Sequence, residues 1–274
     1  MIVIAWLRLL RAGNCTIIAL AAYTGYLVGG GTYTFEALLL ALSALLISAG
    51  GNTINDYFDA EIDAVNKPWR PIPSGIISRE TALAASILAF LAGTALGFYV
   101  SPACGLLAAV ASALLTLYSW KIKRKGLLGN LTIAGLSALN LVYGGLIAPK
   151  PLYSLMPAAY AFLIITGREI LKGLEDVVGD RMGEVKTLAV VRGEKYALIA
   201  STLALMGVIA ISPIPLAMGY GPAYFALAVL GVDLPIIASL AYVWREPIRR
   251  AWRATRILKI PLFAGLLAFL LGAS

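Results

Sequence analysis

Long stretches without a charged residue constrain the fold of this chain more than any other feature of its sequence. Each is about as long as, or longer than, the roughly 17–20 residues that cross the hydrocarbon core of a bilayer as a helix. Backbone amides and carbonyls cannot stay unpaired in hydrocarbon, so uninterrupted helices are the expected form of such segments. The charge-free stretches are residues 12–35, 37–55, 81–120, 126–149, 151–167 and 196–232.

Composition agrees with a membrane protein, because 60% hydrophobic residues and a mean hydropathy of +0.87 are too apolar for an ordinary soluble domain. Dividing the stretches at glycines, prolines and polar clusters predicts an all-α integral membrane protein of nine transmembrane helices, in a single domain over residues 1–274. We expect residues 1–11 to form a short interfacial helix. The predicted spans are 12–30, 36–58, 80–100, 103–120, 127–148, 152–176, 195–213, 219–243 and 256–272.

The basic residues lie almost entirely on one side of these predicted spans. All of the 22 lysines and arginines except Lys150 fall in the N-terminal segment or in the loops after the second, fourth, sixth and eighth spans. By the positive-inside rule, that side is cytoplasmic and the C-terminus lies outside the cell membrane. Topology therefore accounts for the net charge of +8, and we expect membrane lipids as neighbours and no nucleic-acid partner.

A first acidic motif closes the second predicted span. On a helix with about 100° per residue, the carboxylates and amides of this motif fall within about one third of the circumference and so share one face, while Glu61 points elsewhere. Like charges one turn apart repel, and ionised groups near hydrocarbon are costly, so something positive must meet this face. A hard divalent cation is the obvious candidate. The residues of this face are Asn52, Asn55, Asp56, Asp59 and Asp63.

A second acidic motif closes the sixth predicted span, where Asp176 and Asp180 are one helical turn apart and Lys172 precedes them by one turn. Asn55 and Asp176 are 121 residues apart, as are Asp59 and Asp180. This spacing predicts a parallel internal repeat of four helices, with halves at about 12–120 and 127–243 and a ninth span appended. In such a bundle the two acidic faces could oppose each other across a central cavity.

Two carboxylate clusters of this kind can hold two Mg²⁺ ions that clamp a diphosphate and neutralise its charge as it leaves. Basic side chains for the diphosphate oxygens are available in the same cytoplasmic loops, namely Lys67, Arg70, Lys123 and Lys172. The chain has no histidine, which excludes histidine-based acid–base catalysis and the usual zinc sites. Acids at the end of a span can also be simple interfacial groups, but two clusters at equivalent positions make that interpretation weaker.

Three polar residues within or near the predicted spans have two open interpretations. Asn14, Asn140 and Tyr143 are equally suited to hydrogen bonds between neighbouring helices and to substrate contacts. Asp233 is a lone acid within the eighth predicted span and is left without a role.

The two motifs make the chain resemble the UbiA-type membrane prenyltransferase superfamily. The first aspartate-rich motif of that family, N-D-x-x-D-x-x-x-D, is matched by Asn55, Asp56, Asp59 and Asp63, and the second, D-x-x-x-D, by Asp176 and Asp180. The resemblance implies an enzyme that transfers a prenyl group from an isoprenyl diphosphate with the help of Mg²⁺. Asn55, Asp59 and Asp63 would then bind one metal ion and Asp176 and Asp180 the other. For an alcohol acceptor, Asp56 or a phosphate oxygen could accept the proton.

Residues 66–75 (NKPWRPIPSG), 168–172 (REILK) and 186–188 (KTL) resemble those members of the family that make archaeal ether lipid. This resemblance implies transfer of a geranylgeranyl group from geranylgeranyl diphosphate to geranylgeranylglyceryl phosphate. Relatives that prenylate an aromatic acceptor such as 4-hydroxybenzoate share much of the pattern, so that acceptor stays open. Tyr143 and Asn14 are included among the candidate substrate contacts.

Two other classes of membrane protein fit the sequence less well. A CDP-alcohol phosphotransferase also has spaced aspartates, but its D-G-x-x-A-R motif is missing from this chain. A cation transporter would need polar side chains across the whole membrane, whereas this chain gathers them at one end.

Overall fold

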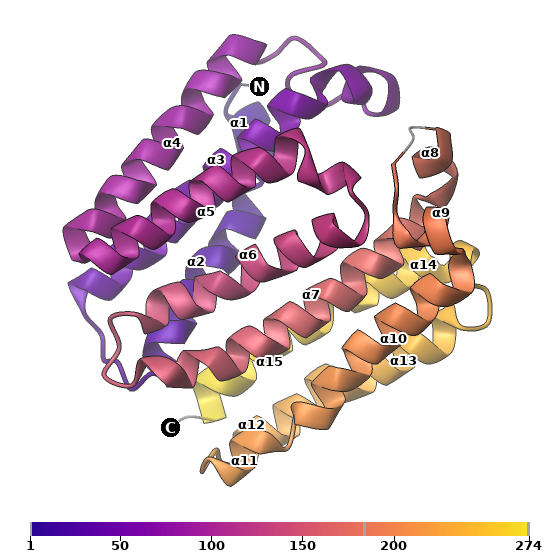
Figure 1. Cartoon of the computed structure of the whole chain (residues 1–274). Coiled ribbons are helices and arrows are strands. Elements are labelled where there is room, and N and C mark those ends of the chain that lie inside the picture. The colour runs from indigo at the N-terminus through magenta and orange to yellow at the C-terminus, as the bar shows by residue number, and fades with distance from the viewer. Residues whose placement is uncertain (1, 183–184, 273–274) are drawn as a thin grey trace. The chain divides into compact units, whose positions relative to one another are not determined.

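The computed structural model describes residues 2–182 and 185–272, and every regular element in these ranges is a helix (Figure 1). The first half contains α1 (Ile2–Leu10), α2 (Ala12–Val28), α3 (Phe35–Asn66), α4 (Arg79–Val100), α5 (Pro102–Trp120), η1 (Ile122–Arg124) and α6 (Leu127–Gly145). The second half contains η2 (Pro151–Ser154), α7 (Leu155–Glu175), α8 (Val177–Met182), α9 (Leu188–Arg192), α10 (Glu194–Ile211), α11 (Ile214–Ala217), α12 (Pro222–Leu227), the π-helix η3 (Ala228–Asp233), α13 (Leu234–Val243), α14 (Pro247–Ile257) and α15 (Lys259–Gly272).

The all-α membrane prediction is confirmed. Within the described ranges, eight helices are long and apolar enough to cross a membrane, and α1 with α2 forms a ninth candidate that is bent by 46°. Each predicted span coincides with one of these segments, although most of the boundaries move by a few residues. The second span is longer than predicted, because α3 continues through the first acidic motif to Asn66.

The helices gather into two compact units. The first unit comprises Met1–Lys121 and Asn140–Pro151, and the second comprises Ile122–Leu139 and Leu152–Ser274. This division differs from the predicted repeat halves, and neither the repeat nor the central cavity is tested by it. Both stay predictions, as does the single domain.

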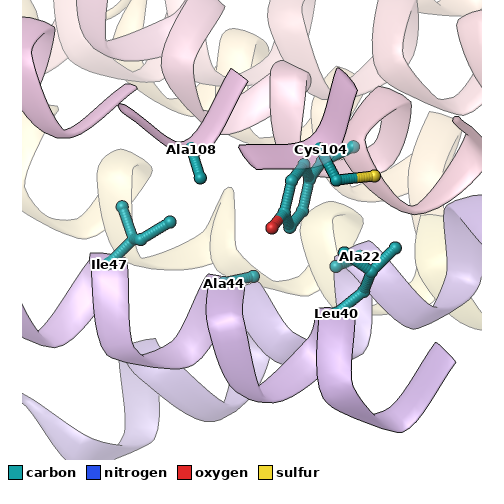
Figure 2. Close-up of a cluster of buried hydrophobic side chains, with 7 residues drawn as sticks. Ala22, Leu40, Ala44, Ile47, Cys104 and Ala108 are labelled. Carbon is teal, nitrogen blue, oxygen red and sulfur yellow. The ribbon is translucent and has the colours of Figure 1, made fainter. Parts of the chain in front are cut away.

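Helix α3 is the central element of the first unit and carries the first motif at its C-terminal end. It begins at the N-cap Thr34, whose hydroxyl accepts a hydrogen bond from the Ala37 amide at 3.2 Å. It ends at Asn66, because Pro68 disfavours helical geometry for Lys67 and could not continue the backbone hydrogen bonds. Figure 2 shows how Leu40, Ala44 and Ile47 of α3 meet Cys104 and Ala108 of α5 and Ala22 of α2.

Small side chains let the helices of the first unit approach closely. A Cβ added at Gly25 of α2 would lie 1.8 Å from the carbonyl oxygen of Leu141, and one at Gly144 of α6 would lie 1.7 Å from that of Ala22. Ser86 of α4 donates to the Gly50 carbonyl of α3 at 2.9 Å. Close packing and hydrogen bonds of this kind hold helices together in lipid. The hydrophobic effect does not drive their association there, because lipid chains are as apolar as the helix surfaces.

In the second unit, α7 carries the second motif at its C-terminal end and packs against α10 and α14. At the opposite end of α7, the Tyr160 hydroxyl donates to the Ile211 carbonyl at 2.7 Å and lies 2.9 Å from the Tyr224 hydroxyl. Asp233 lies at the end of the π-helix and accepts a hydrogen bond from Ser212 at 2.9 Å. The lone intramembrane acid therefore belongs to a polar network at the end of the unit away from the second motif.

Candidate active site

Two arginines meet the first acidic face. Asp56 and Asp63 are each 5% exposed on the last turns of α3. The Asp56 carboxylate accepts hydrogen bonds from Arg11 at 2.6 Å and from Arg70 at 3.2 Å, and Arg70 also donates to Asp63. The expected positive partner of this face is therefore, for Asp56 and Asp63, a pair of guanidinium groups. Buried charges of this kind are tolerated because they are paired and hydrogen-bonded.

The loop after α3 holds Arg70 in place. Its backbone folds back on itself through hydrogen bonds from the Ser74 amide to the Arg70 carbonyl (2.9 Å) and from the Ile77 amide to the Pro71 carbonyl (3.1 Å). Ile72 and Ile77 anchor this loop in a buried cluster that also contains Ala5, Leu9 and Ala82. The apolar face of α1 thus fixes the loop from which Arg70 reaches the motif.

Arg11 occupies the break between α1 and α2. With φ 52° and ψ 55°, it is the one residue other than glycine with a positive φ in the described part of the chain. A left-handed conformation costs a residue with a side chain about 1–2 kcal/mol. Next to the break, the Asn52 amide donates to the Leu10 carbonyl at 3.0 Å. The ion pair with Asp56 and this bond tie the bent segment to α3.

Asn55 and Asp59 form the other part of the first motif. Both are partly buried, and the Asn55 side-chain amide donates to the Asp59 carboxylate at 3.1 Å. Their oxygen atoms are of the hard type that Mg²⁺ prefers.

The second motif follows the end of α7. Asp176 is the C-cap of that helix, and the Asp180 amide donates to the Asp176 carbonyl at 2.9 Å. Burial and the nearby Asp176 carboxylate raise the pKa of Asp180 to about 6, although a hydrogen bond from Thr187 and the charge of Lys172 oppose the shift. Two carboxylates that repel each other in this way are suited to binding a divalent cation.

Lys123 belongs to the second unit and lies in a loop that packs beside the second motif. Gly126 in this loop has a φ of 57°, and a Cβ there would lie 1.8 Å from the Lys186 carbonyl oxygen. The Lys186 amide in turn donates to the Arg124 carbonyl at 3.3 Å. The segment before Thr187, which bonds Asp180, is therefore packed directly against the loop that carries Lys123.

Other charged groups at the end of α7 are paired within the second unit. Arg168 donates to Glu169 at 2.7 Å, and the exposed Lys172 lies 3.9 Å from the same carboxylate. Glu175 accepts a hydrogen bond from Thr255 of α14 at 3.1 Å.

The remaining predicted site residues lie in different environments. Lys67 is exposed at the C-cap of α3, and Asn14 is exposed on the first turn of α2. Tyr143 is buried on α6, and its hydroxyl lies 2.7 Å from the Ser43 hydroxyl of α3. For Tyr143 the structure thus provides the helix–helix hydrogen bond that was one of its two interpretations.

The donor set fits Mg²⁺ rather than a metal held by protein ligands alone. Among the residues that the structure describes, no three histidine, cysteine, aspartate or glutamate side chains are grouped to hold a metal ion. Mg²⁺ commonly needs only one or two carboxylates, because substrate phosphates and water complete its coordination. Asp59 with Asn55, and Asp176 with Asp180, meet that smaller requirement.

Comparisons with known proteins decide the family. The model of the UbiA prenyltransferase family matches residues 15–267. The chain belongs to this family. It is therefore a multi-pass membrane prenyltransferase, as the aspartate motifs predicted.

Individual relatives cover almost the whole chain. A digeranylgeranylglyceryl phosphate synthase of Methanopyrus kandleri is 37% identical over 97% of this chain and 98% of its own length. A solved structure described as giving insights into digeranylgeranylglyceryl phosphate synthase in membranes is 30% identical, with a TM-score of 0.83 over 99% of this chain and 98% of the other. A UbiA homolog from Archaeoglobus fulgidus bound to DMAPP and Mg²⁺ is 18% identical, with a TM-score of 0.70 over 96% and 98% of the two chains, and shares the fold.

Sequence reasoning missed Arg11 as a residue of the site. From the sequence it is used only as a charge that indicates topology, although it is the last charge before the apolar stretch 12–35 and directly precedes Ala12 and Gly13. An arginine at the boundary between the predicted interfacial helix and the first predicted span was the available signal. Its partner Asp56 could not be inferred, because the two residues are 45 positions apart.

Proposed function

We propose that this protein transfers the geranylgeranyl group of geranylgeranyl diphosphate to the free hydroxyl of geranylgeranylglyceryl phosphate, a step of archaeal ether-lipid synthesis. The observation that carries the proposal is the end-to-end similarity to relatives named for the product of that reaction. The two aspartate motifs and the basic residues around them support it. In the reaction, the bond between the allylic carbon and the diphosphate oxygen breaks, and an ether bond to the acceptor oxygen forms.

Mg²⁺ is the cofactor that we propose, and the two aspartate motifs supply its ligands. Asn55 and Asp59 would hold one ion, and Asp63 would join them if its carboxylate released Arg70. Asp176 and Asp180 would hold a second ion. The A. fulgidus homolog bound to Mg²⁺ and DMAPP supports this use of the fold. When bound, the metal neutralises the charge that develops on the departing diphosphate.

The cations of the chain bind and stabilise the diphosphate. We assign this role to Lys67 and Arg70 in the first unit and to Lys123 and Lys172 in the second. Their attraction to the diphosphate grows as the allylic bond breaks and negative charge gathers on the leaving group. They therefore stabilise the transition state more than the bound substrate, which is the requirement for catalysis.

Asp56 is better suited to positioning than to proton transfer. One of its oxygens accepts hydrogen bonds from both Arg11 and Arg70, and the carboxylate is buried. A buried carboxylate bonded to two guanidinium groups holds them in place and is already occupied by these contacts. We therefore assign the proton of the acceptor hydroxyl to a phosphate oxygen of the departing diphosphate.

We place both motifs at the cytoplasmic side of the cell membrane, with the N-terminus on that side and the C-terminus outside. The distribution of lysine and arginine supports this orientation. Water-soluble diphosphate can then leave to the cytoplasm, while the prenyl chains of donor and product stay in the bilayer.

A transfer assay tests the proposal. Membranes containing the protein are given radiolabelled geranylgeranyl diphosphate and either geranylgeranylglyceryl phosphate or 4-hydroxybenzoate, each with Mg²⁺ or with EDTA. We expect product only with the glyceryl phosphate and only with Mg²⁺. If product forms only with the aromatic acid, the protein has a role in quinone synthesis and the proposed acceptor is wrong.

Variants test the metal ligands in the same assay. Asp59→Asn and Asp176→Asn should each lower turnover by about a thousandfold, because a lost metal contact removes several kcal/mol of transition-state stabilisation. Glu246→Gln is the control, since this partly exposed acid pairs with Arg249 and Arg250 of α14. Near-normal turnover in either aspartate variant would contradict the assignment.

A further inference from the structure

A groove between α3 and α4 lies outside the site described above. It has a volume of about 510 Å³ and is lined by Tyr57 of α3 and by Arg79, Glu80, Leu83, Ala84 and Ile87 of α4. All of these residues belong to the first unit, whose helices α3 and α4 pack along each other (Figure 1). The proposed reaction leaves this groove without a role.

The groove is on the far side of α3 from the aspartate motif. At about 100° per residue, Tyr57 and Glu61 point roughly 100–140° around the helix from Asp56. Asp59 and Asp63 lie on the other side of Asp56, and the hydrogen bonds agree with this division. Asp56 and Asp63 pair with Arg11 and Arg70, whereas Glu61 pairs with Arg79. A molecule in the groove would therefore not occupy the motif.

Arg79 supplies the positive charge of the groove. Its guanidinium lies 4.7 Å from the centre of the Tyr57 ring and donates to Glu61 at 3.2 Å. The Glu61 side chain is 85% exposed, so solvent screens this pair and weakens it. The Nε–H of Arg79 is buried, and no acceptor among the residues that the structure describes bonds it. Because an unpaired buried donor costs free energy, an acceptor that reaches it is favoured.

The position of Arg79 along α4 sets the depth of this charge in the bilayer. Arg79 is the first residue of a candidate span that runs to Val100, so it lies where lipid headgroups meet the hydrocarbon. Leu83, Ala84 and Ile87 follow on the same face of α4 and extend the groove by about 12 Å toward the hydrocarbon. The groove thus has a charged end at headgroup level, where Arg79 lies beside Glu80, and an apolar end at chain level.

We propose that this groove binds a phospholipid of the surrounding membrane, with its phosphate on the Arg79 guanidinium and one hydrocarbon chain along Leu83, Ala84 and Ile87. The guanidinium matches a phosphate in charge and in donor geometry. Glu80 also lines the groove and Glu61 pairs with Arg79, so these carboxylates suit a headgroup that also carries hydroxyl or amine donors. The bound lipid is a structural partner and not the acceptor of the prenyl group.

Lipid binding to the delipidated full-length protein tests the proposal. Native mass spectrometry in detergent gives the dissociation constant of the first bound lipid for a diether phosphatidylglycerol and for the same diether glycerol without phosphate. We expect the phosphate-bearing lipid to bind at least about tenfold more tightly, and Arg79→Ala to remove that difference. Equal binding of the two lipids to the wild-type protein would overturn the proposal.

Three further variants separate the groove from general effects on folding. Ala84→Trp places a large side chain in the groove and should weaken binding about tenfold, whereas Leu88→Trp, at a position 66% exposed on the same helix and outside the groove, should not. Glu61→Gln should keep or strengthen binding, because it releases the guanidinium from its surface pair. If Glu61→Gln weakens binding as much as Arg79→Ala, the ion pair has a structural role and the proposal fails.

The prenyl acceptor is itself a lipid phosphate, so its binding must be distinguished from that of a membrane phospholipid. The KM for geranylgeranylglyceryl phosphate is measured in wild-type protein and in Ala84→Trp. We expect an unchanged KM together with the loss of phosphatidylglycerol binding. A raised KM with phosphatidylglycerol binding intact would make the groove an acceptor site and overturn the proposal.

Discussion

At the scale of single residues, the first motif divides its side chains between two tasks. Asp56 and Asp63 are held by Arg11 and Arg70 and give the end of α3 a fixed arrangement of charge. Asn55 and Asp59 form their own hydrogen bond beside them. The spacing of the acids predicts one shared face, but it does not predict this division, which depends on where the two arginines lie.

Backbone strain at Arg11 gives a prediction about stability. Arg11→Gly and Arg11→Ala both lose the ion pair with Asp56, but only glycine also relieves the left-handed conformation. After the greater chain entropy of glycine is subtracted, Arg11→Gly should be more stable than Arg11→Ala by about 1 kcal/mol. Thermal unfolding in detergent measures the difference. At Arg8, within helix α1, the order should reverse, with alanine more stable than glycine.

The raised pKa of Asp180 gives a prediction about pH. Because the folded protein holds a proton on Asp180 up to a pH of about 6, against 3.8 ordinarily, the ionised carboxylate disfavours the fold above that value. Stability in EDTA should therefore fall as pH rises from about 4 to 6. Asp180→Asn should unfold at a higher temperature than wild type at pH 7.5 and at the same temperature near pH 4. A wild-type advantage at pH 7.5 in EDTA would contradict the assignment.

At the scale of elements, the first unit depends on a close approach of α2 and α6. Gly25→Ala would place a methyl group 1.8 Å from the Leu141 carbonyl, so the helices would have to separate. We expect a loss of at least 2–3 kcal/mol, seen as a lower unfolding temperature in detergent. Gly13→Ala on the same helix meets open space and should leave stability unchanged or raise it by up to about 1 kcal/mol. Equal effects of the two changes would disprove the role of close packing.

At the scale of the whole molecule, the charge distribution predicts which loops face the cytoplasm. The native Cys15 and Cys104 are buried, so the wild-type protein should give little background with a membrane-impermeant thiol reagent. Lys150→Cys should react in intact cells, whereas Lys125→Cys should react only after the membrane is permeabilised. The reverse labelling pattern would show the opposite orientation, with the aspartate motifs on the outer side of the membrane.

The helical membrane fold, the candidate spans and the two aspartate motifs could all be predicted from the sequence. Each of these depends on local properties: a charge-free run long enough to cross a bilayer, or acids one helical turn apart. Other contacts depend on the tertiary structure. Arg11 pairs with Asp56, and Arg70 joins Asp56 to Asp63. Tyr143 bonds Ser43, and Lys123 lies beside the segment before Thr187. These contacts link residues far apart along the chain, and their formation depends on how helices and loops pack, which periodicity and composition do not encode.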